Sequence, residues 1–224
     1  MQFVSRHSLV TGACEGLEVQ THWPRPLRGA IGPAGAGPGG RLLAQGGRIL
    51  RAACCEASTW PSPWRVVVAV ADCQLAQGAL LRQVAEALAD SSLDPERLEL
   101  EMTEHALLDA DLDTLLVLAA LRDLGVAIGL DEYGGGVTSL SLLRRMPLSG
   151  IKLDASLVRN LPADAEDRAL VSALLAAAHG MGLQVVAAGV ETESQRTFLC
   201  DSGCDIGQGR LFGGPAPAGS FRRG

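Results

Sequence analysis

Four short apolar runs, each leading directly to an acidic residue, constrain the fold of this chain more than any other feature. They are Leu98–Glu104 (L-E-L-E-M-T-E), Val126–Tyr133 (V-A-I-G-L-D-E-Y), Ile151–Asp154 (I-K-L-D) and Val185–Glu191 (V-V-A-A-G-V-E). Short strands that carry charged side chains at their carboxyl ends are typical of parallel barrels, which build metal sites there. In the fourth run, Ala188 stands where the pattern predicts another carboxylate.

Predicted strands and helices alternate along most of the chain. Strands are expected at residues 17–20, 65–70, 98–102, 126–130, 150–153, 184–187 and 204–207, and helices at 42–58, 76–91, 112–124, 139–145, 167–181 and 194–202. This alternation predicts a parallel sheet covered by helices. The number of repeats favours an α/β fold of the TIM-like (β/α) barrel type. Asp167 is placed to cap the fifth of these helices.

The N-terminal part of the chain is less regular than the rest. Residues 24–40 are dominated by Gly, Pro and Ala, and we expect them to form a flexible loop in a shortened N-terminal lobe. No linker divides the remainder. Residues 1–224 are therefore predicted to form a single domain.

Composition excludes several classes of protein. A formal net charge of −6 argues against a general binder of nucleic acid or anionic membranes. No apolar run approaches the ~20 residues of a membrane-spanning helix, and no signal peptide is recognised, so a cytoplasmic protein is expected. The six cysteines show no paired Cys-x-x-Cys spacing, and most are expected to be small buried side chains.

Several motifs, in this order along the chain, together resemble one family. They are Glu101-Met-Thr-Glu104, Asp131-Glu-Tyr-Gly-Gly-Gly-Val-Thr-Ser-Leu140, Ile151-Lys-Leu-Asp154, Gly189-Val-Glu-Thr192, and Gly203-Cys-Asp-Ile-Gly-Gln-Gly209 followed by Leu211-Phe212. With them the chain resembles the EAL domain, a bacterial phosphodiesterase that opens cyclic di-GMP to the linear dinucleotide pGpG. The resemblance covers nearly the whole chain and is strongest from about Leu75 onward.

The resemblance implies a TIM-like barrel with a metal-assisted active site at the carboxyl ends of its strands. Family enzymes hold Mg²⁺ or Mn²⁺ with carboxylates and one asparagine, which are hard oxygen ligands suited to these ions. Residue by residue, it assigns metal binding to Glu18, Glu101 and Asp131, orientation of the attacking water to Lys152, support of the loop after Asp131 to Glu104, and contacts with the ligand to Glu132, Glu191 and Gln208.

Several positions depart from the family pattern. The catalytic glutamate of the family is Ala188 here, and its asparagine ligand is Ala69. Its second aspartate is Glu132, longer by one methylene, and the glutamine-proline of its first strand aligns with Val4 and Ser5. Removing a positioned general base typically costs ~10²–10⁴ in rate. We therefore expect a degenerate, inactive member that binds Mg²⁺ or Mn²⁺ weakly or not at all.

Three functions remain open on this basis. The favoured one is a regulatory module of cyclic di-GMP signalling that acts by protein contact. It would bind a partner protein or form a homodimer through the face near Asp131 and the helix that follows, where Val137, Leu140 and Leu142 lie. The second is a cyclic di-GMP receptor without turnover, and the third a weakly active metal-dependent phosphodiesterase. No nucleic acid partner is expected.

Overall fold

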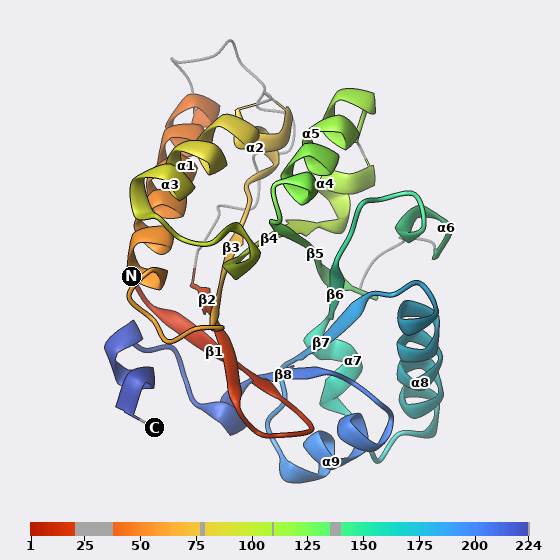
Figure 1. The fold of residues 1–224 in the computed structure, drawn as a ribbon. Coiled ribbons are helices and arrows are strands. Elements are labelled where there is room, and N and C mark those ends of the chain that lie inside the picture. Colours follow the sequence, from red (N-terminus) through yellow and green to blue (C-terminus); the bar gives the residue numbers. More distant parts are fainter. Residues whose placement is uncertain (21–37, 77–78, 109, 135–139, 224) are drawn as a thin grey trace.

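In the computed structural model, eight strands close into a barrel whose order in space follows the chain (Figure 1). The structure describes residues 1–20, 38–76, 79–108, 110–134 and 140–223. Strand β1 runs antiparallel to both of its neighbours, β2 and β8, whereas all other neighbouring strands are parallel. The predicted TIM-like α/β barrel is confirmed, with a first strand that runs against the others.

The elements have the following bounds. The strands are β1 (Phe3–Ser8), β2 (Cys14–Val19), β3 (Arg65–Ala69), β4 (Leu98–Thr103), β5 (Ala127–Tyr133), β6 (Gly150–Leu153), β7 (Gln184–Ala188) and β8 (Ile206–Gln208). The α-helices are α1 (Pro38–Ala57), α2 (Asp72–Ala76), α3 (Leu80–Ser91), α4 (Glu104–Leu108), α5 (Leu112–Asp123), α6 (Leu140–Leu143), α7 (Ala155–Arg159), α8 (Ala165–Gly180) and α9 (Glu193–Asp201). Short 3₁₀ turns cover Pro95–Arg97, Arg210–Phe212 and Ala218–Arg223.

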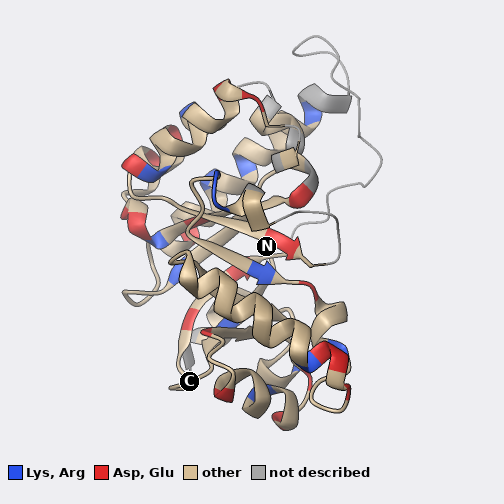
Figure 2. Cartoon of the chain, turned by 90° about the vertical axis from the view of Figure 1, so that its right-hand side faces the viewer, with Lys and Arg blue, Asp and Glu red and all other residues tan. Residues whose placement is uncertain are grey.

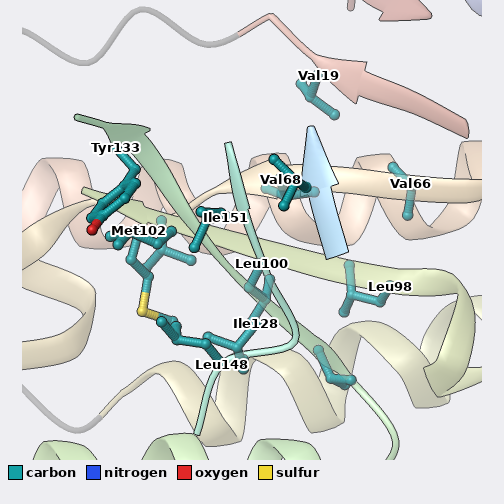
Figure 3. Packing of buried hydrophobic residues seen from close by; sticks show 14 of the residues in the cluster. Val19, Val66, Val68, Leu98, Leu100, Met102, Ile128, Tyr133, Leu148 and Ile151 are labelled. Atoms are coloured by element: carbon teal, nitrogen blue, oxygen red, sulfur yellow. The ribbon is translucent and has the colours of Figure 1, made fainter. Parts of the chain in front are cut away.

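Alternation along β4 explains how one strand serves two environments. Leu98, Leu100 and Met102 are fully buried and pack with Ile128 and other apolar side chains between the barrel and its helices (Figure 3). Because successive side chains of a strand point to opposite faces, Glu99 and Glu101 point into the barrel. The apolar half of L-E-L-E-M-T therefore builds the core, and its acidic half lines the interior.

Helices wrap the outside of the barrel (Figure 1). On α3, Leu80, Val84 and Ala87 are buried at helical spacing and belong to the same apolar cluster as Leu50 and Ala53 of the neighbouring α1. In the view of Figure 2, acidic and basic residues are interspersed on the outer helices. No helix in the described ranges is both long and apolar enough to cross a membrane.

Several local predictions need correction. Of the helix expected at 76–91, residues 80–91 form α3, residue 76 ends the preceding α2, and residues 77–78 lie outside the described residues. Helix α8 is capped by Asp164, whose side chain accepts from the amides of Glu166 and Asp167, so Asp167 is not the cap. Of the loop expected at 24–40, the stretch up to residue 37 lies outside the described residues, and residues 38–40 begin α1.

The cysteines are less buried than expected, which leads to a testable difference in reactivity. Only Cys54 and Cys204 are buried, whereas Cys55 is exposed. Burial raises the pKa of both buried thiols to about 12. Because the thiolate is the reactive form, we expect a thiol reagent at pH 8 to modify Cys54 and Cys204 roughly 10³-fold more slowly than Cys55. Peptide mapping after timed labelling measures this, and unfolded protein should label at all six positions. Equal rates in the native protein would contradict the burial.

Candidate functional site

Polar side chains from five strands meet inside the barrel toward the carboxyl ends of the parallel strands. Glu18 comes from β2, Glu101 from β4, Asp131 from β5, Lys152 from β6 and Gln208 from β8. Each follows apolar residues that fix its strand in the core, so the backbone holds the polar group in position. All five are site residues predicted from the sequence, and the fold brings them together.

Lys152 is the centre of this cluster. Its Nζ lies 3.0 Å from Glu18 Oε2, 2.7 Å from Glu101 Oε2 and 3.1 Å from Asp131 Oδ1. Gln208 Nε2 donates to the same oxygen of Glu18 at 2.9 Å. Lys152 is 6% exposed and Glu101 2%. The only lysine of the chain is thus a buried ammonium in contact with three carboxylates.

A second cation, Arg6 of β1, enters the cluster and is not among the predicted site residues. Its Nη1 donates to Glu99 Oε1 at 2.9 Å, and its Nη2 donates to Glu18 Oε2 at 3.0 Å and to Glu101 Oε1. Its Nε is buried without a hydrogen-bond partner in the described part of the chain. No sequence pattern marks it, because polar and apolar residues do not alternate along β1.

Burial and the neighbouring charges shift the pKa values of these groups. Burial raises the pKa of Glu101 to about 7, against the opposing charges of Arg6 and Lys152. Burial also acts to raise the pKa of Glu18, but Lys152 and Arg6 outweigh it and lower this pKa to about 2. Both glutamates contact the same two cations. They differ because Glu101 is the more buried and lies near two other carboxylates, Glu18 and Asp131.

Burial tends to lower the pKa of each cation, and the carboxylates reverse this. The charges of Glu101, Glu18 and Asp131 raise the pKa of Lys152 well above its ordinary value. The pKa of Arg6 is also raised, by Glu101, Glu99 and Glu18. Both cations therefore stay charged at neutral pH.

Two alanines occupy strand ends beside this cluster. Ala69 ends β3 and pairs in register with Glu101, and Ala188 ends β7 and pairs with Gln208. A methyl side chain offers neither a metal ligand nor a group that accepts a proton. The positions that the resemblance gives to an asparagine ligand and a catalytic glutamate thus lie beside Glu101 and Gln208 but carry no polar side-chain atoms.

The other predicted residues lie outside the cluster. Glu132 is exposed and has a left-handed backbone, with φ of 56°. Glu191 is also exposed, 3.9 Å from Arg210 Nε. Glu104 accepts a long hydrogen bond of 3.4 Å from the backbone amide of Gly134, in the segment after Asp131. Asp154, the acidic end of I-K-L-D, instead caps α7 by accepting from the amide of Ser156.

A cavity of about 400 Å³ reaches the cluster from the end of the barrel where the parallel strands begin. Its lining includes Arg65 and Gln184, at the amino-terminal ends of β3 and β7, and Glu101 and Lys152 in the interior. Gly129 helps to keep it open, since a Cβ there would lie 3.0 Å from Glu99 Oε1. The carboxylates of β4 therefore face open space toward the amino-terminal end of the barrel.

These side chains do not fit a pair of divalent cations. Oxygens that a metal would need already accept hydrogen bonds from Arg6 and Lys152. Among the residues that the structure describes, no group of three or more His, Cys, Asp or Glu side chains is arranged to hold a metal ion. The geometry is that of an ion network in which two protein cations contact four carboxyl groups.

The family model of the EAL domain matches residues 1–215. The chain belongs to the EAL domain family. It is 37% identical over 216 residues to the bifunctional diguanylate cyclase/cyclic di-GMP phosphodiesterase MucR of Pseudomonas aeruginosa, a match covering 92% of this chain and 31% of MucR. It is 36% identical over 218 residues to the cyclic di-GMP phosphodiesterase NbdA of the same organism, covering 94% of this chain and 28% of NbdA.

Solved EAL structures share the fold. The MucR phosphodiesterase in complex with cyclic di-GMP superposes with a TM-score of 0.85 at 33% identity, covering 98% of this chain and 92% of that one. The EAL domain of Mycobacterium smegmatis DcpA gives a TM-score of 0.83 at 28% identity, covering 99% and 92%. Among the curated relatives, the chain spans 31% of MucR and 28% of NbdA, so the activities of those whole proteins are not established for it.

Proposed function

We propose that this EAL domain does not hydrolyse cyclic di-GMP and acts in cyclic di-GMP signalling as a regulatory module, through contact with another protein. The observation that carries the proposal is the pair of alanines, Ala69 and Ala188, at the edge of a cluster whose carboxylates are bonded to Arg6 and Lys152. Two-metal hydrolysis needs ligands that hold both ions and a group that takes the proton of the attacking water.

The remaining site residues fit a site that has lost its catalytic function. Glu18, Glu101 and Asp131 would be the former metal ligands, now neutralised by protein cations. Lys152 would have changed from orienting water to holding the barrel together. Losing a general base alone costs ~10²–10⁴ in rate, and a missing metal ligand compounds that loss.

Four further residues keep roles that do not require chemistry. We propose that Glu104 supports the loop after Asp131, through its bond to the amide of Gly134. The exposed carboxylates of Glu132 and Glu191 would line the mouth where a nucleotide approaches the strand ends, and Gln208 would contact it from inside the barrel.

The turnover assay is direct. Purified protein is incubated with cyclic di-GMP and millimolar Mg²⁺ or Mn²⁺, and the products are separated by chromatography. We expect no pGpG above a blank without protein. Formation of pGpG that disappears in the variant Glu101→Gln would refute the proposal, because contamination by another phosphodiesterase would not respond to that substitution.

Exposed leucines support a protein contact. Leu112 and Leu116, one turn apart on α5, are 70% and 60% exposed, and Leu140 of α6 is 45% exposed. Two other residues were predicted to lie at a dimer face, Val137 and Leu142. Val137 and the side chain of Leu142 are not among the parts of the chain that the structure describes. We propose that a second copy of the chain covers these leucines. Light scattering should then give a dimer that Leu112→Asp/Leu116→Asp converts to a monomer.

A second function, binding of cyclic di-GMP without turnover, is favoured by one comparison. The MucR phosphodiesterase that resembles this chain over almost its full length was solved in complex with cyclic di-GMP. Calorimetric titration with cyclic di-GMP in EDTA separates this function from the first. Saturable heat that is lost in Gln208→Ala supports a receptor, and no heat at any concentration leaves the protein-contact module.

A further inference from the structure

An arginine side chain lies where the acidic residues of the barrel converge. Arg6 is 2% exposed, and its guanidinium spans Glu18 of β2 and both inward-pointing glutamates of β4. Glu99 and Glu101 lie two residues apart, so they point to the same side of the strand. One side chain of β1 therefore connects three carboxylates from two strands.

The count of charges shows why this position matters. Glu18, Glu99, Glu101 and Asp131 supply four carboxyl groups, and Arg6 and Lys152 supply two cations. Glu101 accepts from Arg6 with Oε1 and from Lys152 with Oε2, and one oxygen of Glu18 accepts from both cations. Without Arg6, the two glutamates nearest the centre would share a single positive charge.

We infer that Arg6 is a built-in counter-cation of the barrel, which takes over the charge neutralisation that a divalent metal ion supplies and excludes such an ion from Glu18 and Glu101. Mg²⁺ binds carboxylate oxygens at about 2.0–2.1 Å. Guanidinium and ammonium groups already lie within hydrogen-bond distance of those oxygens, and a dication beside them would meet two positive charges at low dielectric.

Arginine suits this role better than any other side chain. Its guanidinium does not lose its proton in proteins, and its planar fork can donate to several carboxylates at once. The neutralisation is therefore permanent, whereas that by a metal ion depends on the ion concentration. This inference rests on the proposed function and extends it, because it explains how the acidic cluster persists in a barrel without catalytic metal ions.

The test is metal binding in the absence of nucleotide. We expect wild-type protein to show no tight site for Mn²⁺ by calorimetry and no shift of its melting temperature in MnCl₂. The variant Arg6→Met removes the charge and keeps the length. It should melt about 10 °C lower in EDTA, and Mn²⁺ at a hundredfold its Kd should recover roughly 5 °C or more.

Two variants control for the loss of an arginine as such. Arg97 donates to the backbone carbonyls of Ala57 and Trp64 rather than to carboxylates. Arg97→Met should therefore lower the melting temperature without any recovery in Mn²⁺. Arg6→Lys retains a positive charge and should remain insensitive to the metal.

Three results would overturn the inference. They are a tight Mn²⁺ site in the wild type, an Arg6→Met variant that folds but is indifferent to Mn²⁺, and an Arg6→Met variant that fails to fold even with Mn²⁺. Wild-type protein that binds Mn²⁺ but makes no pGpG would overturn the counter-cation role and leave the proposed function intact. Formation of pGpG would refute the proposed function itself.

Discussion

Replacement of Lys152 by methionine is expected to lower the free energy of unfolding by about 3–5 kcal/mol at pH 7, because it removes one partner from a buried ion network. Methionine has a similar length and no charge, so the change leaves Glu18, Glu101 and Asp131 with Arg6 as the only cation of the network. Urea denaturation followed by circular dichroism measures the loss.

A matched control compares the loss of this buried cation with the loss of a cation in a surface ion pair. Arg51 pairs with Glu86 and Asp90 on the surface, with about half of each side chain exposed. Arg51→Met should cost no more than about 1 kcal/mol. A similar cost for Lys152→Met would mean that the network contributes little to stability.

The cost of Lys152→Met should also depend on pH. Lys152 is the largest of the charges that lower the pKa of Glu18 to about 2, from an ordinary value of 4.5. A lowered pKa in the folded state stabilises the protein above pH 4.5, and this stabilisation is lost as the pH falls toward 2. The difference in unfolding free energy between wild type and Lys152→Met should therefore become smaller below about pH 4.5. A gap that widens with acid would show that Glu18 is not paired as described.

Residues on the inner face of the barrel could be predicted where polar and apolar residues alternate along a strand, or where a charged residue directly follows an apolar run. In L-E-L-E-M-T, buried apolar residues separate the acidic ones. Because side chains alternate between the two faces of a strand, Glu101 is expected to point away from the face that carries Leu100 and Met102. The carboxyl ends of parallel strands meet at one end of a barrel, which places Asp131 and Lys152 at the same end. Local pattern and topology were sufficient there. Glu18 was assigned by the resemblance to the EAL domain.

The features that were missed lack such a pattern. In β1, the four residues from Phe3 to Arg6 are all buried, so no polar–apolar alternation marks Arg6 as inward-pointing. Helices α4 and α7 have five residues each, too few to show a helical repeat of apolar positions. Competing caps a few residues apart, Asp164 and Asp167, cannot be ranked from sequence, since either carboxylate can accept from the first amides of a helix.

Substitution of Gly209 by alanine should be at least as damaging as loss of the lysine, for a reason of backbone geometry. Gly209 follows Gln208 at the end of β8 and has φ of 154°. A Cβ there would overlap the carbonyl oxygen and the nitrogen of Val190, two atoms bonded to the amide of Leu211 and the carbonyl of Gln208. The clash is with backbone and cannot be relieved by a rotamer change.

We expect Gly209→Ala to lose about 4 kcal/mol or more of unfolding free energy, or to yield no folded protein. Gly214→Ala is the matched control, because nothing lies within 4 Å of a Cβ at that position, and it should change stability by less than about 0.5 kcal/mol. Since Gly209 fixes the strand that carries Gln208, any folded Gly209→Ala protein should also have lost the bond from Gln208 to Glu18. Equal stabilities of the two variants would show that β8 does not pack against Val190 this closely.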